Sequence, residues 1–132
     1  MIKIYTDGAS RGNPGESAFA FIFTEKGKVI FLSAEYIGRA TNNIAEYRAI
    51  ISALREARNK NIDRASLISD SELVISQING TYKTKAAHLK KLNEEVKELC
   101  AQFVSIKFSN APRTDEFIRI ADKLCNTILD LA

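Results

Sequence analysis

Three acidic residues of this sequence lie at positions where their carboxylates could together bind a metal ion. Asp7 and Asp70 each follow a short β-rich run, and Glu46 lies near the start of an amphipathic segment. The carboxyl ends of neighbouring parallel strands meet at one edge of a sheet, about 4.8 Å apart. Carboxylates that close repel each other unless a cation neutralises them. Ligation by acids alone, without a nearby histidine or cysteine cluster, is typical of Mg²⁺ or Mn²⁺, so the pattern predicts a divalent-metal site.

Some of these polar residues could instead have a purely structural role as helix caps or turn residues, and the residue types alone do not decide between the two roles. An aspartate directly after a strand is often a helix cap or a turn residue. Asp70 is such a case, because Ser71 and a segment of helical character follow it. One of Asn42 and Asn43, which open the amphipathic segment that carries Glu46, could likewise be a helix cap.

The elements that must position these acids follow from the hydrophobic pattern. β-rich runs predict five strands, at 2–6, 18–24, 28–36, 65–69 and 103–108, with a hairpin loop at 25–27. Apolar residues at helical spacing predict four helices, at about 43–60, at 72–79 with Gly80 as terminator, at about 89–99, and along Phe117, Ile120, Ala121, Leu124, Ile128 and Leu131. This order predicts an α/β fold with a five-stranded mixed sheet, in which the first, fourth and fifth strands are parallel.

Composition narrows the class of protein. A chain of 132 residues with 45% hydrophobic content predicts one domain over residues 1–132. The formal net charge of +3 excludes a polybasic arm and an acidic tail. Cys100 and Cys125 are too few for a disulfide framework and lack zinc-site spacing, so we expect buried thiols. Without a signal peptide or an apolar run of about 18 residues, we expect a cytoplasmic protein that does not enter a membrane.

Four motifs surround the candidate acids. They are Thr6-Asp7-Gly8-Ala9-Ser10-Arg11-Gly12-Asn13-Pro14-Gly15, which its glycines and proline predict to be a turn-rich loop, Thr41-Asn42-Asn43-Ile44-Ala45-Glu46-Tyr47, Ser69-Asp70-Ser71-Glu72-Leu73-Val74, and Ile120-Ala121-Asp122-Lys123-Leu124-Cys125-Asn126. In this order and in these contexts they closely resemble the type 1 ribonuclease H family, over essentially the whole chain. The resemblance implies a ribonuclease H-like fold, with helices on both faces of the sheet.

The resemblance also implies an activity. The protein would be a metal-dependent endonuclease that hydrolyses the RNA strand of RNA–DNA hybrids and leaves 5′-phosphate and 3′-hydroxyl ends. Two Mg²⁺ or Mn²⁺ ions would be held by Asp7, Glu46, Asp70 and Asp122, with Asp7 bridging both. Such a pair suits phosphodiester hydrolysis, because one ion lowers the pKa of the attacking water while the other stabilises the leaving oxygen.

Substrate contacts are implied for a second set of residues. The resemblance assigns Asn13, Asn42 and Asn43 to the hybrid, and Thr41 to a phosphate of the DNA strand. Asparagine amides can exchange hydrogen bonds with minor-groove base edges and with 2′-hydroxyls, which distinguish RNA from DNA. Gly8 would allow the RNA backbone to approach more closely than a side chain permits.

The C-terminal part departs most from the family pattern. Asp115 and Glu116 compete with Asp122 for the role of fourth acid, and Asp122 is favoured because its Ala-Asp-x-Leu context matches the family. Some relatives carry a histidine in the preceding loop, whereas the only histidine here, His88, belongs to another segment. Arg113 is the nearest candidate for a comparable contact with the leaving phosphate.

A basic segment offers a further contact. Residues 83–91 contain four lysines, one histidine and no acid, which fits either a contact with the DNA strand or a solvated helix entry. The alternative function is a module on the same fold that binds hybrid or double-stranded RNA without cutting it. Four retained acids favour the enzyme, because a pure binder has no use for clustered carboxylates. We expect a monomer without an obligatory protein partner.

Overall fold

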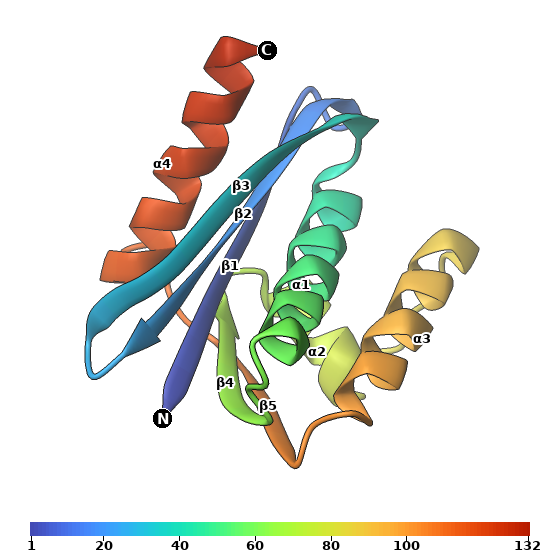
Figure 1. Ribbon diagram of the computed structural model, residues 1–132. Helices are drawn as coiled ribbons and strands as arrows, with labels where there is room; N and C mark the ends of the chain where they lie inside the picture. The colour runs from blue at the N-terminus through green and yellow to red at the C-terminus, as the bar shows by residue number, and fades with distance from the viewer.

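A five-stranded sheet runs through the protein, whose computed structural model describes residues 1–132 (Figure 1). The elements along the chain are β1 (Ile2–Arg11), β2 (Gly15–Glu25), β3 (Lys28–Ala40), α1 (Asn42–Asn59), β4 (Arg64–Ser69), α2 (Glu72–Asn79), α3 (Ala87–Cys100), β5 (Ser105–Asn110) and α4 (Glu116–Leu131). Every predicted strand and helix is present in the predicted order.

The strands lie in the order β3-β2-β1-β4-β5. The first three form an antiparallel meander, whereas β1, β4 and β5 pair in parallel. Helices α1, α2 and α3 cover one face of the sheet and α4 covers the other (Figure 1). The predicted α/β fold, with its mixed sheet and two covered faces, is confirmed.

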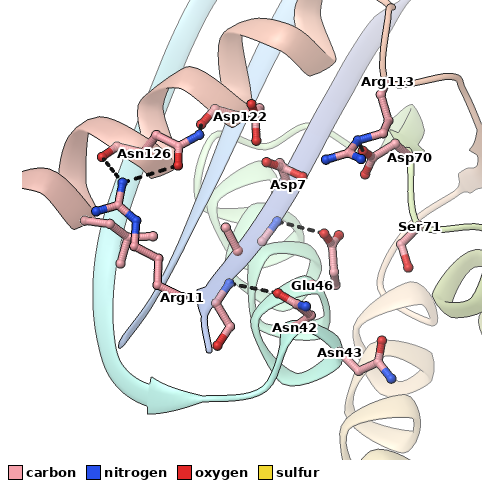
Figure 2. A pocket seen from close by; sticks show the side chains of 14 residues that line it. Asp7, Arg11, Asn42, Asn43, Glu46, Asp70, Ser71, Arg113, Asp122 and Asn126 are labelled. Carbon is pink, nitrogen blue, oxygen red and sulfur yellow. Dashed lines mark hydrogen bonds and ion pairs between the residues drawn. The ribbon is translucent and has the colours of Figure 1, made fainter. Parts of the chain in front are cut away.

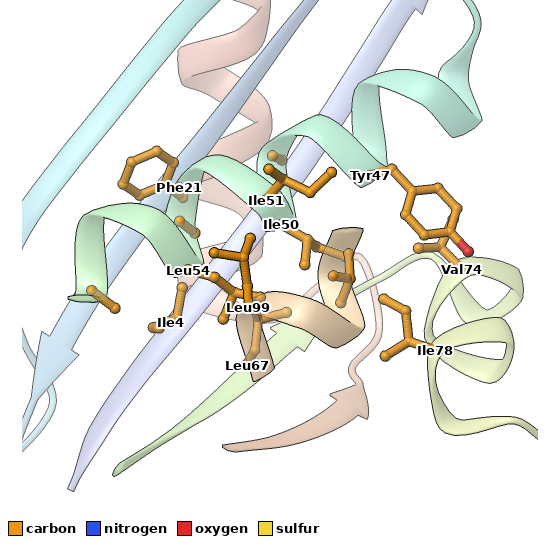
Figure 3. Packing of buried hydrophobic residues seen from close by; sticks show 14 of the residues in the cluster. Ile4, Phe21, Tyr47, Ile50, Ile51, Leu54, Leu67, Val74, Ile78 and Leu99 are labelled. Atoms are coloured by element: carbon orange, nitrogen blue, oxygen red, sulfur yellow. The ribbon is translucent and has the colours of Figure 1, made fainter. Parts of the chain in front are cut away.

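Two hydrophobic cores hold the helices on the sheet, one on each face. Strand β2 serves both, because side chains alternate along a strand. Phe19, Phe21 and Phe23 face the larger core with α1, α2 and α3, part of which Figure 3 shows. Ala18 and Ala20 face α4 and belong to the smaller core. Strand β2 therefore presents bulky side chains to one layer of helices and small ones to the other.

The buried stripe of α4 differs from the one the sequence predicted. It consists of Ile118, Ala121, Cys125 and Leu129. Leu131, expected at the end of the stripe, is 79% exposed. A single helix on a strongly twisted sheet touches it along a narrow line, so the residues beside that line stay half in solvent.

Strand β1 continues through the segment that was expected to be a loop. Its antiparallel ladder with β2 runs on to the pair of Arg11 and Glu16, and only residues 12–14 form the turn. Asp7 therefore lies inside β1 rather than after it. The sequence prediction was wrong here because a glycine-rich segment can still pair when a neighbouring strand supplies the hydrogen bonds. Strand β5 also begins later than predicted, since its ladder with β4 starts at Ser105.

Helix caps remove several alternatives that the sequence left open. Thr41, Ser71 and Asp115 are the N-caps of α1, α2 and α4, and each side chain accepts a hydrogen bond from a first-turn backbone N–H. Asp70 is therefore not a cap, and neither are the asparagines that follow Thr41. Gly80 ends α2 in the left-handed conformation, as predicted.

The two cysteines are free thiols on opposite faces of the sheet. Cys100 ends α3 and is partly buried, whereas Cys125 is fully buried on α4. None of the helices has both the length and the apolar character that crossing a bilayer requires.

A buried hydrogen-bond network joins the three helices of the larger face. The Tyr47 hydroxyl donates to Gln77 Oε1 at 2.7 Å and accepts from Asn93 Nδ2 at 3.2 Å. All three side chains are buried, and they come from α1, α2 and α3. Because such a network tolerates one arrangement, it fixes how α2 and α3 sit against α1.

Replacing Tyr47 by phenylalanine should destabilise the protein. The substitution leaves Gln77 and Asn93 buried without their partner, which costs about 1–3 kcal/mol. Urea unfolding should show a lower midpoint with an unchanged m-value. Tyr36→Phe is the matched control, because its hydroxyl bonds Glu16 at the surface and its removal should cost little. Equal losses in the two variants would contradict the role given to the network.

Candidate active site

Three acids meet at the carboxyl edge of the parallel strands. Strands β1 and β4 make their last parallel pair between Thr6 and Ser69, so the next residues, Asp7 and Asp70, emerge side by side. Glu46 reaches the same point from the second turn of α1. One oxygen from each carboxylate lies within 4.8 Å of the others (Figure 2). The predicted convergence of these three acids is confirmed.

Glu46 is held in place by the strands beneath it. Its Oε1 accepts a hydrogen bond from the Gly8 backbone N–H at 3.0 Å, and its Oε2 accepts one from the Ser69 hydroxyl at 3.4 Å. The start of α1 lies so close to β1 that a Cβ at Gly8 would stand 2.4 Å from the carbonyl carbon of Ala45. Glycine is thus required there by the helix itself, a reason that the sequence did not reveal.

Burial and mutual repulsion make the cluster electrostatically costly. Asp7 is 4% exposed, and burial, followed by repulsion from Asp70 and Asp122, raises its pKa to about 8. Burial, then repulsion from Asp7, raises the pKa of Glu46 well above its ordinary value. Burial also raises the pKa of Asp70, against which the Arg113 guanidinium, 3.7 Å away, acts in the opposite direction. These carboxylates therefore need a positive partner to stay ionised together.

The donor set fits a hard divalent cation. Asp7 Oδ2 is buried and has no hydrogen-bond partner among the protein atoms. An orphaned carboxylate oxygen is expensive unless a cation or a donor satisfies it. Since the neighbouring ligands are also carboxylate oxygens, Mg²⁺ or Mn²⁺ suits the cluster better than zinc or copper.

Asp122 approaches the cluster from the other face of the sheet. It projects from α4 into the pocket that holds the three acids, and its charge raises the pKa of both Asp7 and Asp70 (Figure 2). Asp115 is committed elsewhere, because its Oδ1 accepts hydrogen bonds from the backbone N–H groups of Phe117 and Ile118 in the first turn of α4, at 3.0 and 3.1 Å. Glu116 lines a different cavity. Geometry thus favours Asp122 as the fourth acid.

The acids open into a cavity of about 600 Å³. Of the expected substrate residues, Gly8, Asn42 and Asn43 line it, whereas Asn13 and Thr41 lie outside. Asn42 is held between two neighbours: its Oδ1 accepts from the Ser10 backbone N–H at 2.8 Å, and its own backbone N–H donates to Asn13 Oδ1 at 2.9 Å. Asn13 therefore supports Asn42, and Thr41 caps the helix that carries it.

Several lining residues had no role in the sequence prediction, notably Ser10, Arg11, Ser71 and Asn126. The first two were hidden because their segment was expected to be a loop. Asn126 could have been found, since it lies one helical turn beyond Asp122 and therefore on the same face of α4. His88 lies on α3, away from the residues that line the pocket.

The fold is shared with known ribonucleases H. RNase H1 from the archaeon Halobacterium salinarum superposes with a TM-score of 0.94 at 37% identity, covering 99% of this chain and 98% of that one. LC11-RNase H1, whose structure holds an RNA/DNA hybrid, superposes with a TM-score of 0.91 at 34% identity over the full length of both chains. A family model described as reverse transcriptase-like matches residues 5–128.

The sequence therefore belongs to the ribonuclease H family. The bifunctional protein Rv2228c from Mycobacterium tuberculosis is 38% identical over 133 residues, which cover 99% of this chain and 36% of that protein. Ribonuclease HI from Halobacterium salinarum is 37% identical over 98% of this chain and 64% of its own length. This chain thus spans only part of the length of these curated relatives.

The raised pKa of Asp7 predicts how stability depends on pH when no metal is present. Between pH 3.8 and about 8 the folded protein keeps a proton on Asp7 that the unfolded chain has released. The free energy of unfolding must therefore fall as pH rises through this interval. Glu46 acts in the same direction. Asp7→Asn should flatten the slope, and Mg²⁺ should restore stability at pH 8 because it binds the folded cluster.

Urea unfolding at a series of pH values, with EDTA or with Mg²⁺, measures this effect. Asp63→Asn is the control, since that exposed acid precedes β4 at the opposite edge of the sheet and should leave the slope unchanged. A wild-type protein whose stability is independent of pH over this interval would show that the pKa of Asp7 is not raised as described.

Proposed function

We propose that the protein is a metal-dependent endonuclease that hydrolyses the RNA strand of RNA–DNA hybrids, leaving 5′-phosphate and 3′-hydroxyl ends. The observation that carries the proposal is the convergence of Asp7, Glu46 and Asp70, with one buried carboxylate oxygen left without a partner. Support also comes from LC11-RNase H1, a relative of the same length and fold that is bound to an RNA/DNA hybrid.

Asp7, Glu46, Asp70 and Asp122 would hold two Mg²⁺ or Mn²⁺ ions. The chemistry that such ions supply when bound is activation of water and neutralisation of negative charge on the phosphate and the leaving oxygen. Asp7 lies between Asp70 on one side and Asp122 on the other (Figure 2). This central position suits the acid that would serve both ions.

The other pocket residues orient these acids and the substrate. The Gly8 N–H and the Ser69 hydroxyl fix the carboxylate of Glu46, so that it cannot rotate away from the cluster. Arg113 stands beside Asp70 with most of its side chain in solvent. We assign it to a contact with the leaving phosphate, because an exposed guanidinium at the pocket rim can form paired hydrogen bonds with phosphate oxygens.

Recognition of the hybrid falls to the first turn of α1. The side-chain oxygen of Asn42 is occupied by the Ser10 N–H, which leaves its amide NH₂ to donate to base edges or 2′-hydroxyls. Asn43 lies beside it at the edge of the pocket (Figure 2). The hydroxyl proton of Thr41 can still be donated to a DNA phosphate while its oxygen caps the helix. Gly8 lies at the same edge, where the RNA backbone would pass.

A basic surface extends the contact beyond the pocket. The side chains of Lys83, Lys85, Lys90 and Lys91 are exposed around the start of α3. Exposed lysines of this kind bind phosphates without reading sequence. We propose the DNA strand as their partner, residues 1–132 as one catalytic domain, and a monomer in the cytoplasm as the working form.

Labelled substrates test the proposal directly. Incubated with Mg²⁺ or Mn²⁺, the protein should cut the RNA strand of a hybrid and leave duplex DNA intact, and end-group analysis should show 5′-phosphates. Asp70→Asn should abolish cleavage but still bind hybrid, because only a metal-holding carboxylate is lost. Binding without cleavage under both metals would instead identify a non-cleaving hybrid or double-stranded RNA module, and cleavage of duplex RNA would widen the substrate class.

A pair of matched variants tests the fourth acid. Asp122→Asn should lose Mg²⁺-dependent cleavage, because its carboxylate faces Asp7 across the pocket. Asp115→Asn should retain activity and stability, because asparagine caps a helix about as well as aspartate does. An inactive Asp115→Asn beside a normal Asp122→Asn would refute the assignment.

A further inference from the structure

Asp122 is the acid whose position depends most on tertiary packing. Asp7 and Asp70 are placed by the β1–β4 ladder, and Glu46 is held by two hydrogen bonds. Asp122 is exposed on α4 and reaches the cluster from the opposite face of the sheet. Its distance from Asp7 is therefore set by how α4 lies along β1.

Apolar packing alone does not fix the position of α4 along its own axis. Its buried stripe rests partly on Ala18 and Ala20 of β2, and contacts with such small side chains are not directional. Directional contacts are few along this seam. In the middle, Cys125 Sγ lies 3.6 Å from the carbonyl oxygen of Asp7. At the far end, Arg11 of β1 supplies three more.

The contacts of Arg11 all go to one side of α4. Its Nη2 lies 2.6 Å from Asp130 Oδ1, 3.3 Å from the Asn126 carbonyl oxygen and 3.4 Å from Asn126 Oδ1 (Figure 2). Asn126 in turn donates from Nδ2 to the carbonyl oxygen of Asp122 at 3.1 Å. Hydrogen bonds thus run from the end of β1 to the backbone of the residue that carries the fourth carboxylate.

The spacing along the two elements matches. Asp7 and Arg11 are four residues apart on one face of β1, which is about 13 Å. Asp122 and Asp130 are eight residues apart on one face of α4, which is about 12 Å. A helix running along the strand can therefore meet it at both points, with Arg11 on Asp130 at one end and Asp122 facing Asp7 at the other.

We propose that Arg11 is a positioning residue that sets the axial register of α4 on β1 and thereby places Asp122 opposite Asp7. The ion pair with Asp130 is largely exposed, and such pairs contribute little to stability. Its role is therefore to select one position of α4. This inference rests on the proposed function, in which Asp122 helps to hold a divalent ion.

Two variants separate positioning from substrate contact. Arg11→Ala removes all three contacts but also removes a cation from the pocket wall. Asp130→Asn removes the main anchor while leaving Arg11 in place, and Asp130 does not line the pocket. Arg55→Ala is the matched control, since Arg55 and Glu95 form an ion pair of similar exposure, 3.4 Å long, far from the acids.

Steady-state cleavage of hybrid at a series of Mg²⁺ concentrations gives the first measurement. Both Arg11→Ala and Asp130→Asn should lower kcat, by about 10-fold for Arg11→Ala, and raise the Mg²⁺ concentration for half-maximal rate. KM for hybrid should not rise in Asp130→Asn, and Arg11→Lys should recover part of the loss. Arg55→Ala should match the wild type in every respect.

A second measurement does not depend on activity. In the metal-free protein, hydrogen exchange of the α4 amides between Asp122 and Asp130 should be faster in Arg11→Ala and Asp130→Asn than in Arg55→Ala. Normal kcat, normal Mg²⁺ dependence and unchanged exchange would overturn the proposal. So would a higher KM confined to Arg11→Ala, which would make Arg11 a substrate contact. If the wild type cuts no hybrid, the proposed function fails. Hydrogen exchange of the α4 amides and calorimetric measurement of Mn²⁺ binding then still test the role of Arg11.

Discussion

Electrostatic repulsion among carboxylates held out of water is the constraint on which the rest of the structure depends. Asp7 and Glu46 are almost completely buried, and burial is the main reason why their pKa values rise. Repulsion from Asp70 and Asp122 adds to the rise for Asp7, and repulsion from Asp7 adds to it for Glu46. The Gly8 N–H, the Ser69 hydroxyl and Arg113 offset part of this repulsion. One oxygen of Asp7 remains without a partner, so the site is complete only with a cation. The same repulsion that weakens the metal-free fold therefore creates affinity for a divalent ion.

Strand β1 organises the site because its neighbours change halfway along it. Over residues 2–6 it pairs with β2 on one side and β4 on the other. Beyond that point it pairs only with β2, which opens its other edge to the first turn of α1. One face and the free edge of β1 then serve different parts of the site. The side chains of Asp7 and Arg11 face α4, while the backbone N–H groups of Gly8 and Ser10 donate hydrogen bonds to side chains of α1. The acid cluster and the asparagines at the start of α1 are thus tied to one strand.

Much of the site was predictable because its residues lie at positions that local rules mark. Asp70 follows a strand, Glu46 falls on the sheet-facing side of an amphipathic helix, and Gly80 stands where a helix must end. The errors arose where a local rule met a long-range partner. Glycines around Asp7 suggested a loop, yet pairing with β2 keeps that segment extended. Capping by one of the two asparagines at the start of α1 was an alternative that the sequence left open, and Thr41, the residue before them, takes that role.

The sequence by itself determined the order and type of the elements, and with them the edge of the sheet at which Asp7, Glu46 and Asp70 had to meet. Hydrophobic periodicity and strand connectivity suffice for this, because they depend on neighbours along the chain and on the few topologies a mixed sheet allows. Only the tertiary structure decided which atoms of these acids are left without a partner, why Gly8 must lack a side chain, and how Arg11 forms its hydrogen bonds and ion pair with α4. Those features depend on distances between segments up to 119 residues apart, as for Arg11 and Asp130, and no local pattern encodes such distances.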